Sequence, residues 1–329
     1  MPASTVIGCG SHLPARVVSN EELAVELGVP VDVVDRSGVR RRHHAEPGTG
    51  PSDLARDATL GVLQRAGNEP ADIDFIVFAT MTPDITFPGP GCFIQHKLGC
   101  RTVGALDVRA QCAGFLFALT IADRFIAAGS MARVLVAGGE VHSTALDYSP
   151  RGAHVTPYFG DGAGVVLLGA GDRPGVLASV LHNDPTDLER FWCEFPASRH
   201  YPARMDREHM EAGQHHCQLD AERLHPQAER SIAEAAREAL ARAGVAADAV
   251  GLALVHYFDH RVARTAAAKA GFATERTVAT AEAAGHMAAA GIPIALADAI
   301  AAGRVGRGDV ICAVAFGAGL AWGAVVLRL

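Results

Sequence analysis

Short apolar runs alternate along the chain with longer segments that end in glycine. The run at residues 75–78 follows a segment that ends at Gly67, and the run at residues 133–138 follows a segment that ends at Gly129. Glycine commonly ends helices, and apolar runs without period-two alternation are typical of strands that are covered on both faces. The pattern therefore predicts helices that alternate with buried strands, which is an α/β fold.

The same pattern recurs in the second half of the chain. Ala71-Asp72 precedes the strand at residues 75–78, and Ala247-Asp248 precedes a similar strand at residues 252–255, an offset of 176 positions. A helix-like segment that ends at Gly303 likewise repeats, at nearly the same offset, the segment that ends at Gly129. Two phrases in the same order indicate an internal duplication.

The duplication divides the chain into two halves. We expect them to span residues 1–170 and 171–329, because the periodic pattern breaks at residues 169–174 (Gly-Ala-Gly-Asp-Arg-Pro). Residues 191–217 match neither repeat and are rich in His, Arg and Pro, so we expect an irregular insertion there, over a site or an interface.

Composition and charge exclude several classes of protein. The 329 residues carry 29 Lys and Arg against 36 Asp and Glu, a net charge of −7, which argues against nucleic acid or an anionic membrane surface as a partner. The seven cysteines are scattered without a Cys-x-x-Cys pair, residues 1–13 show no secretory signal, and no apolar run approaches membrane-spanning length. These features predict a soluble, cytoplasmic protein.

One cysteine stands at a position that suits chemistry. A strand at residues 103–108 leads through Arg109-Ala110-Gln111 into Cys112, after which a long apolar helix begins. The unpaired N–H groups and the dipole of a helix N-terminus stabilise a thiolate, so we expect Cys112 to be nucleophilic at neutral pH. Taken alone, a cysteine is more often an inert core residue.

Two histidines of the second half are expected to join Cys112. The segment of the second half that matches the Cys112 turn contains Gly285-His286 before a helix near residue 288, so we expect His286 to be the counterpart of the cysteine. His256 directly follows the strand at residues 252–255, at the end where α/β folds place active groups. A thiol with two imidazoles can relay a proton and stabilise an oxyanion or enolate, although either histidine taken singly is more often structural.

Five motifs give the chain a family resemblance. They are residues 7–14, 36–40, 107–114 (DVRAQCAG), 159–164 (FGDGAG) and 316–323 (FGAGLAWG). The chain resembles the β-ketoacyl-acyl carrier protein synthase III family over nearly its whole length. The resemblance implies an internally duplicated thiolase-like fold with five layers, α-β-α-β-α, and a homodimer.

The resemblance also implies roles for individual residues. Cys112 would take an acyl group from a CoA or acyl carrier protein thioester, in an oxyanion hole formed by the N–H groups of Cys112 and Ala318. His256 would support the second half-reaction, on a small-molecule acceptor or a malonyl thioester. No cofactor is expected. The positions that match substrate-binding or pocket residues of the family are Phe87 (across the dimer interface), Arg36, Arg151, Arg261, Tyr257, Phe258, Asp259, Phe316 and Gly317.

The chain departs from the family pattern at three places. His286 stands where the family usually has Asn, and Tyr257-Phe258-Asp259 follow His256 where small and amide side chains are usual. Asp32 matches an aromatic that stacks on the CoA adenine in many members. An anion at Asp259, if it pointed inward, would disfavour a malonyl substrate.

These departures favour an acyltransferase of a specialised, polyketide- or antibiotic-type pathway, which passes the acyl group from Cys112 to an alcohol or amine. The alternative within the family is decarboxylative Claisen condensation with a malonyl thioester. Alternatives of another class are a catalytically inactive scaffold and a metal-binding or regulatory module that uses His209, His215, His216 and Cys217.

Overall fold

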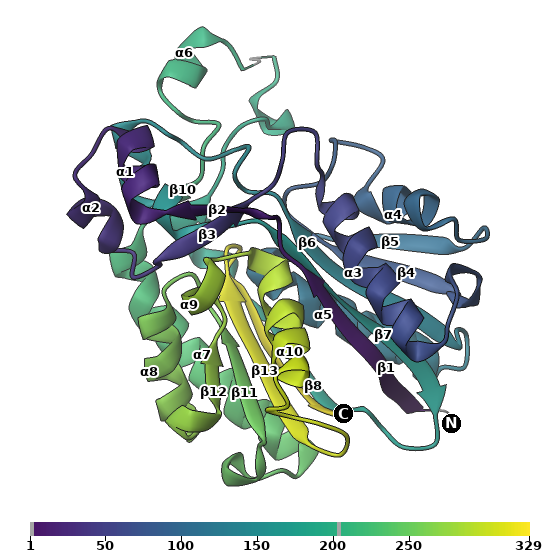
Figure 1. Ribbon diagram of the computed structural model, residues 1–329. Coiled ribbons are helices and arrows are strands. Elements are labelled where there is room, and N and C mark those ends of the chain that lie inside the picture. The colour runs from purple at the N-terminus through teal and green to yellow at the C-terminus, as the bar shows by residue number, and fades with distance from the viewer. Residues whose placement is uncertain (1–2, 203–204) are drawn as a thin grey trace.

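The structure, a computed structural model, describes residues 3–202 and 205–329, which form two five-stranded sheets separated by helices (Figure 1). In the first sheet, β4 runs parallel to β5 and β6, while β7 runs antiparallel to β6 and to β1. The strands, in spatial order, are β1 (Ala3–His12), β7 (Gly162–Gly171), β6 (Arg133–Glu140), β4 (Phe75–Ala79) and β5 (Gly104–Val108).

The second sheet repeats this arrangement of strand directions. Here β11 runs parallel to β12 and β13, while β14 runs antiparallel to β13 and to β8. The strands, in spatial order, are β12 (Thr277–Ala279), β11 (Leu252–His256), β13 (Val310–Gly317), β14 (Ala321–Arg328) and β8 (Val176–Asn183). The predicted alternation of helices with buried strands is therefore confirmed in both sheets.

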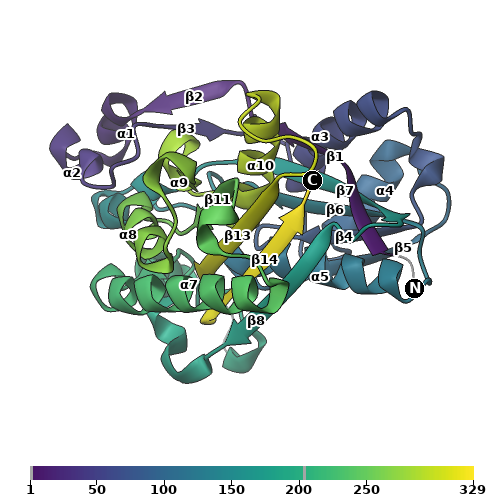
Figure 2. The same ribbon diagram turned by 90° about the horizontal axis from the view of Figure 1, so that it is seen from below.

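Three pairs of helices form the other layers. The helices α3 (Pro51–Ala66) and α4 (Pro90–Leu98) cover the outer face of the first sheet, and α7 (Ala221–Ala243) and α8 (His260–Ala270) cover the outer face of the second (Figure 2). Between the sheets lie α5 (Gly114–Ala127) and α10 (Gly291–Ala301). The result is the five-layer α-β-α-β-α architecture of the thiolase-like fold.

The sequence of α5 explains its central place. Phe115, Leu116, Leu119 and Ile126 are all buried, and the helix packs against strands of both sheets. A helix that is apolar on nearly every side has no face that favours water, so it is stable only when it is covered on all sides. Its N-terminus, and that of α10, lie where β5, β11 and β13 end, which defines the position of the site.

The remaining elements cover this end of the molecule. They are β2 (Arg16–Ser19), α1 (Asn20–Leu27), α2 (Val31–Asp35), β3 (Arg41–His44), α9 (Ala281–Ala284), β9 (Phe191–Trp192), α6 (Arg207–Glu211) and β10 (Gln218–Leu219). The predicted insertion at residues 191–217 contains β9 and α6, and β10, which directly follows it, pairs with β9. Residues 203 and 204 of the insertion lie outside the described part of the chain. None of the described helices is both long and apolar enough to cross a membrane.

Candidate active site

Cys112 lies in a single 3-10 turn that connects β5 to α5. The turn spans Gln111–Ala113, and Gln111 has a positive φ of 44°, a backbone conformation that few residues other than glycine adopt. This backbone directs the cysteine inward, and its side chain is only 2% exposed. The thiol therefore reacts inside the protein rather than at its surface.

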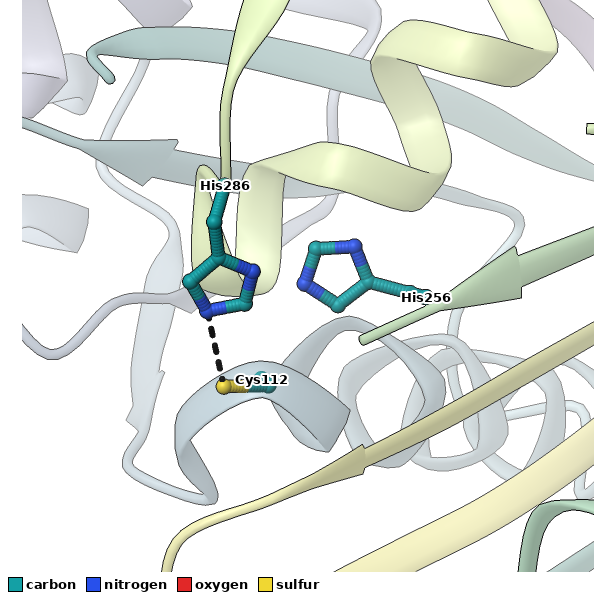
Figure 3. Close-up of side chains that lie close together, drawn as sticks. All are labelled: Cys112, His256 and His286. Atoms are coloured by element: carbon teal, nitrogen blue, oxygen red, sulfur yellow. Dashed lines mark hydrogen bonds between the residues drawn. The ribbon is translucent and has the colours of Figure 1, made fainter. Parts of the chain in front are cut away.

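The main chain holds His286 over this thiol. His286 donates its N–H to Tyr158 O at 2.7 Å, and its carbonyl accepts from Gly160 N at 3.1 Å. The ring nitrogen Nε2 then lies 3.3 Å from Cys112 Sγ. Figure 3 marks this contact with a dashed line. The nitrogen is close enough to accept the proton of the thiol.

His256 extends from the end of β11 beside His286. The two rings stack with centroids 4.7 Å apart and planes 18° apart, and Nδ1 of His256 is 2.5 Å from Thr280 Oγ1. Gly291 leaves room for this ring, because a Cβ there would lie 2.4 Å from its atoms. Nε2 of His256 is buried and has no hydrogen-bond partner among the described residues, so it is free to meet a substrate. One side-chain nitrogen or sulfur atom from each of Cys112, His256 and His286 lies within 4.8 Å of the other two.

The expected equivalence between His286 and Cys112 is wrong. The turn Ala288–Ala290 precedes α10 as Gln111–Ala113 precedes α5, and Ala288 shares the positive φ of Gln111. Ala289 is therefore the counterpart of Cys112, and His286 lies three positions earlier. His286 reaches the thiol because its loop pairs with residues 158–160, which the repeat does not predict.

Burial opposes the stabilisation of a thiolate that the helix N-terminus predicts for Cys112. Burial raises the pKa of Cys112 to about 12, and the negative charge of Glu140 adds to this effect. Burial lowers the pKa of His256 to about 3 and also holds the pKa of His286 well below its usual value. The resting site is therefore a neutral thiol beside two neutral imidazoles, because burial outweighs the favourable helix N-terminus.

Two backbone N–H groups lie close to the sulfur. The N–H groups of Ala318 and of Cys112 itself lower the pKa of the Cys112 thiol, against the larger effect of burial. Gly317 allows this approach, since a Cβ on that residue would lie 2.6 Å from Cys112 Cβ and 2.7 Å from Sγ. Backbone N–H groups beside a nucleophilic sulfur are the kind of donor that an oxyanion hole requires.

Three aromatic side chains wall the second-half side of the site. Tyr257, Phe258 and Phe316 are all buried, and Phe316 packs edge-on against Tyr257 at 5.9 Å. The hydroxyl of Tyr257 lies 3.3 Å from His225 Nδ1. The bulky residues that depart from the family pattern therefore form part of the apolar core around Cys112.

Asp259 does not present a free negative charge to the site. Its carboxylate accepts from the Nε and Nη2 atoms of Arg261 at 2.9 and 2.5 Å, and from Arg261 N at the start of α8. Burial alone would raise the pKa of Asp259, but these hydrogen bonds and the Arg261 charge hold it below its usual value. The positive charge of Arg261 therefore offsets the repulsion that Asp259 would otherwise exert on a malonyl group.

The other expected binding residues lie away from the buried cluster. Arg36 pairs with Asp32 at 3.5 Å and is largely exposed. Arg151 binds Asp147 at 2.6 Å and donates to Glu211 O at 2.8 Å, which fastens α6 to the body of the protein. Phe87 is 81% exposed. In this single chain, none of these three joins the walls around Cys112.

Sequence reasoning missed three polar residues behind the histidines. They are Thr280, which bonds His256, and the buried pair Glu140 and His142 at the end of β6. Gly138-Gly139-Glu140 directly ends a predicted strand, so the rule that selected His256 could also have selected Glu140.

The metal-binding alternative gains no support from its residues. His209 bonds Asp206, and His216 bonds Ala145 O at 3.0 Å. Within residues 3–202 and 205–329, the one group of three or more close His, Cys, Asp or Glu ligand atoms is Cys112, His256 and His286. The insertion does not gather such a group.

Comparisons with known proteins identify the family of the chain. The family profile described as 3-Oxoacyl-[acyl-carrier-protein (ACP)] synthase III matches residues 106–185, and the profile of its C-terminal part matches residues 240–329. A "Beta-ketoacyl-[acyl-carrier-protein] synthase III" from Methylococcus capsulatus is 34% identical over 326 residues, covering 99% of this chain and 98% of the relative.

Solved structures give the same result. The 3-oxoacyl-[acyl-carrier-protein] synthase III of Aquifex aeolicus is 32% identical with a TM-score of 0.87, covering 99% of this chain and 100% of that one. The priming β-ketosynthase of the R1128 polyketide pathway is 30% identical with a TM-score of 0.89, covering 99% and 96%. The chain belongs to the 3-oxoacyl-[acyl-carrier-protein] synthase III family.

Proposed function

We propose that this protein is an acyltransferase that loads an acyl group from a thioester onto Cys112 and then joins it to a second substrate. The observation that carries this proposal is the contact of 3.3 Å between Cys112 Sγ and His286 Nε2, with the N–H groups of Cys112 and Ala318 beside the sulfur. These are a nucleophile, a base and an oxyanion hole.

In the first half-reaction, His286 Nε2 takes the proton of the thiol while the sulfur attacks the carbonyl carbon of the donor thioester. The oxyanion of the tetrahedral intermediate lies between the N–H groups of Cys112 and Ala318. When the intermediate collapses, the bond to the donor sulfur breaks, and that sulfur leaves with the proton from His286. The product is acyl-Cys112 and a free CoA or carrier-protein thiol.

For the second half-reaction, the site favours condensation with a malonyl thioester. When carbon dioxide leaves, the electron pair of the broken carbon–carbon bond remains on the thioester as an enolate. Nε2 of His256, which has no other hydrogen-bond partner among the described residues, can donate a hydrogen bond to the enolate oxygen. The enolate carbon attacks the acyl carbon, and the Cys112 sulfur leaves as a thiolate that takes up a proton from water. The pairing of Asp259 with Arg261 supports this reaction, because it removes the reason to expect exclusion of an anionic substrate.

A second candidate is transfer of the acyl group to an alcohol or amine, with His256 as the general base. The bulky Tyr257 and Phe258 beside the site favour it, since they stand where the family usually has smaller groups. The two candidates share acyl-Cys112 and differ only in the acceptor.

Exposed residues support a proposal for the identity of the acyl donor and for the assembly of the protein. Asp32 pairs with Arg36 instead of offering an aromatic to an adenine, so we infer that an acyl carrier protein is preferred over CoA as donor. Phe87 is exposed in the single chain, and in a homodimer, which the family resemblance implies, its side chain would be covered by the second copy.

Similarity to a polyketide priming ketosynthase supports a role in starting acyl chains of a specialised pathway.

One assay separates the two acceptors. Protein acylated on Cys112 is mixed with malonyl-carrier protein labelled at the free carboxyl group, or with alcohol and amine acceptors. Release of labelled carbon dioxide together with a β-ketoacyl thioester supports condensation. An ester or amide without carbon dioxide release supports transfer, and discharge by neither acceptor class would refute both.

A further inference from the structure

A buried carboxylate lies behind the site. Glu140, at the end of β6, is completely buried and accepts hydrogen bonds from two backbone N–H groups and two hydroxyls. The donors are Met81 N at 3.2 Å, Ala289 N at 3.3 Å, Thr80 Oγ1 at 3.2 Å and Thr82 Oγ1 at 2.6 Å. A backbone N–H can only donate, so these hydrogen bonds favour the charged form of Glu140, but complete burial outweighs them and raises the pKa of Glu140 above its usual value.

His142 faces this carboxylate with a fixed ring. Its Nδ1 lies 3.1 Å from Gly160 O, and because a carbonyl can only accept, Nδ1 carries a proton. Its Nε2 is buried without a hydrogen-bond partner in the described part of the chain and lies 4.0 Å from Glu140 Oε2. If the His142 ring were neutral, Nε2 would carry no proton, and its lone pair would face the buried negative charge of Glu140.

Such an arrangement is costly inside a protein, and one additional proton removes the cost. We propose that Glu140 and His142 hold one shared proton at neutral pH, and that this pair sets the charge behind Cys112 and His286. With the proton in place, the pair has no net charge. Without it, the uncovered charge of Glu140 opposes the loss of the Cys112 proton.

Two contacts connect the pair to the reacting groups. Gly160 accepts from His142 through its carbonyl and donates its N–H to the carbonyl of His286 at 3.1 Å. Glu140 also holds the N–H of Ala289, in the turn that mirrors the Cys112 turn. In addition, the charge of Glu140 is one of the effects that raise the pKa of Cys112, after burial. Both residues are positioning residues, because they act through Cys112 and His286.

Other titratable groups lie near the pair and enter its balance. Asp161, before β7, accepts from Ser143 N, next to His142, at 3.0 Å. Glu140 influences the pKa of Cys112 before α5, and His142 influences those of His256 of β11 and His286 after α9. These groups are the same in every variant below, so each comparison isolates the pair.

This proposal rests on Cys112 as the nucleophile of the proposed function, but its test needs no acyl donor. The rate at which iodoacetamide alkylates Cys112 is followed at pH 8 by mass spectrometry of the Cys112 peptide, so that the other six cysteines do not interfere. A protein that never accepts an acyl group could still give the expected result, which keeps the two failures distinct.

His142→Gln removes the proton partner and leaves the charge of Glu140 uncovered. We expect alkylation to slow about tenfold, the effect of one pKa unit. Glu140→Gln alone should stay within about threefold of the unchanged protein, since a neutral His142 and a neutral amide again carry no net charge. The double variant should recover the rate of Glu140→Gln. The exposed Glu234→Gln on α7 is the control for loss of a carboxylate.

Rescue by the second substitution is the decisive result, because a merely structural role of His142 would not be repaired by changing Glu140. An unaltered rate in His142→Gln, or a double variant as slow as His142→Gln, would overturn the proposal. Should His142→Gln fail to fold, the unchanged protein gives the answer. Nitrogen NMR and infrared spectra at pH 7 should show either a doubly protonated His142 ring or a protonated Glu140, and a singly protonated ring beside an ionised Glu140 would contradict it.

Discussion

Replacement of His286 by alanine tests whether this residue is the base for Cys112. The pKa of the buried thiol is about 12, which is 4.5 units above pH 7.5. Ionisation without a proton acceptor therefore costs about 6 kcal/mol at that pH. His286 Nε2, 3.3 Å from the sulfur, avoids this cost by taking the proton as the bond to the acyl carbon forms. We expect His286→Ala to slow acylation by about 10² to 10⁴.

The pH dependence gives the sharper readout. In His286→Ala, acylation must use the small fraction of thiolate, so the rate should rise about tenfold per pH unit between pH 7 and 10. Single-turnover mixing with an acyl thioester, followed by intact-protein mass spectrometry, measures both quantities. His96→Ala, an exposed histidine of α4, is the matched control. A His286→Ala protein that acylates within about threefold of the unchanged protein, or shows no such slope, would refute the reasoning.

Three further predictions concern the surroundings of this pair. Gly317→Ala places a Cβ 2.6 Å from Cys112 Cβ and should displace the Ala318 donor; acylation in single turnover should fall by roughly 10². Gly306→Ala, where a Cβ meets nothing within 4 Å, should not change it, and equal rates in the two variants would contradict the role of Gly317. Arg261→Met removes the main partner of Asp259 and leaves only the more distant His225, at 3.9 Å; it should raise the KM for malonyl-carrier protein roughly tenfold while the acylation rate stays unchanged, and an equal loss in both steps would contradict it. Burial lowers the pKa of His256 from 6.5 to about 3, so between these values the unfolded chain binds a proton that the folded chain does not. The folded state therefore has its full stability with respect to His256 above pH 6.5, and it loses stability relative to the unfolded chain as the pH falls from 6.5 toward 3. Urea unfolding should show about 2 kcal/mol less stability at pH 5 than at pH 7 from this residue, and an equal loss in His256→Gln would contradict the assignment.

Local sequence patterns were sufficient to predict much of the fold. Short apolar runs and glycine ends predicted the alternating strands and helices, and the repeat at 176 positions predicted two similar units. The two sheets do share one arrangement of strand directions. Strand ends are placed by local sequence, so the positions of Cys112 and His256 were also predictable.

The errors have a common physical origin in tertiary packing. The repeat suggested His286 as the counterpart of Cys112, but its position over the thiol comes from hydrogen bonds to Tyr158 and Gly160, which lie far away in the sequence. The raised pKa of Cys112 is not predictable from the sequence, because the helix N-terminus is visible there whereas complete burial is not. The partner of Asp259 is two residues away, yet only the fold shows that Arg261 turns back onto it.

The most direct test of the proposed function is the mass of the Cys112 peptide after the protein is mixed with acyl-carrier protein or acyl-CoA. The peptide should gain the mass of the acyl group, and Cys112→Ala should gain nothing at any position. Absence of an adduct with every thioester, or an adduct that survives in Cys112→Ala, would contradict the account.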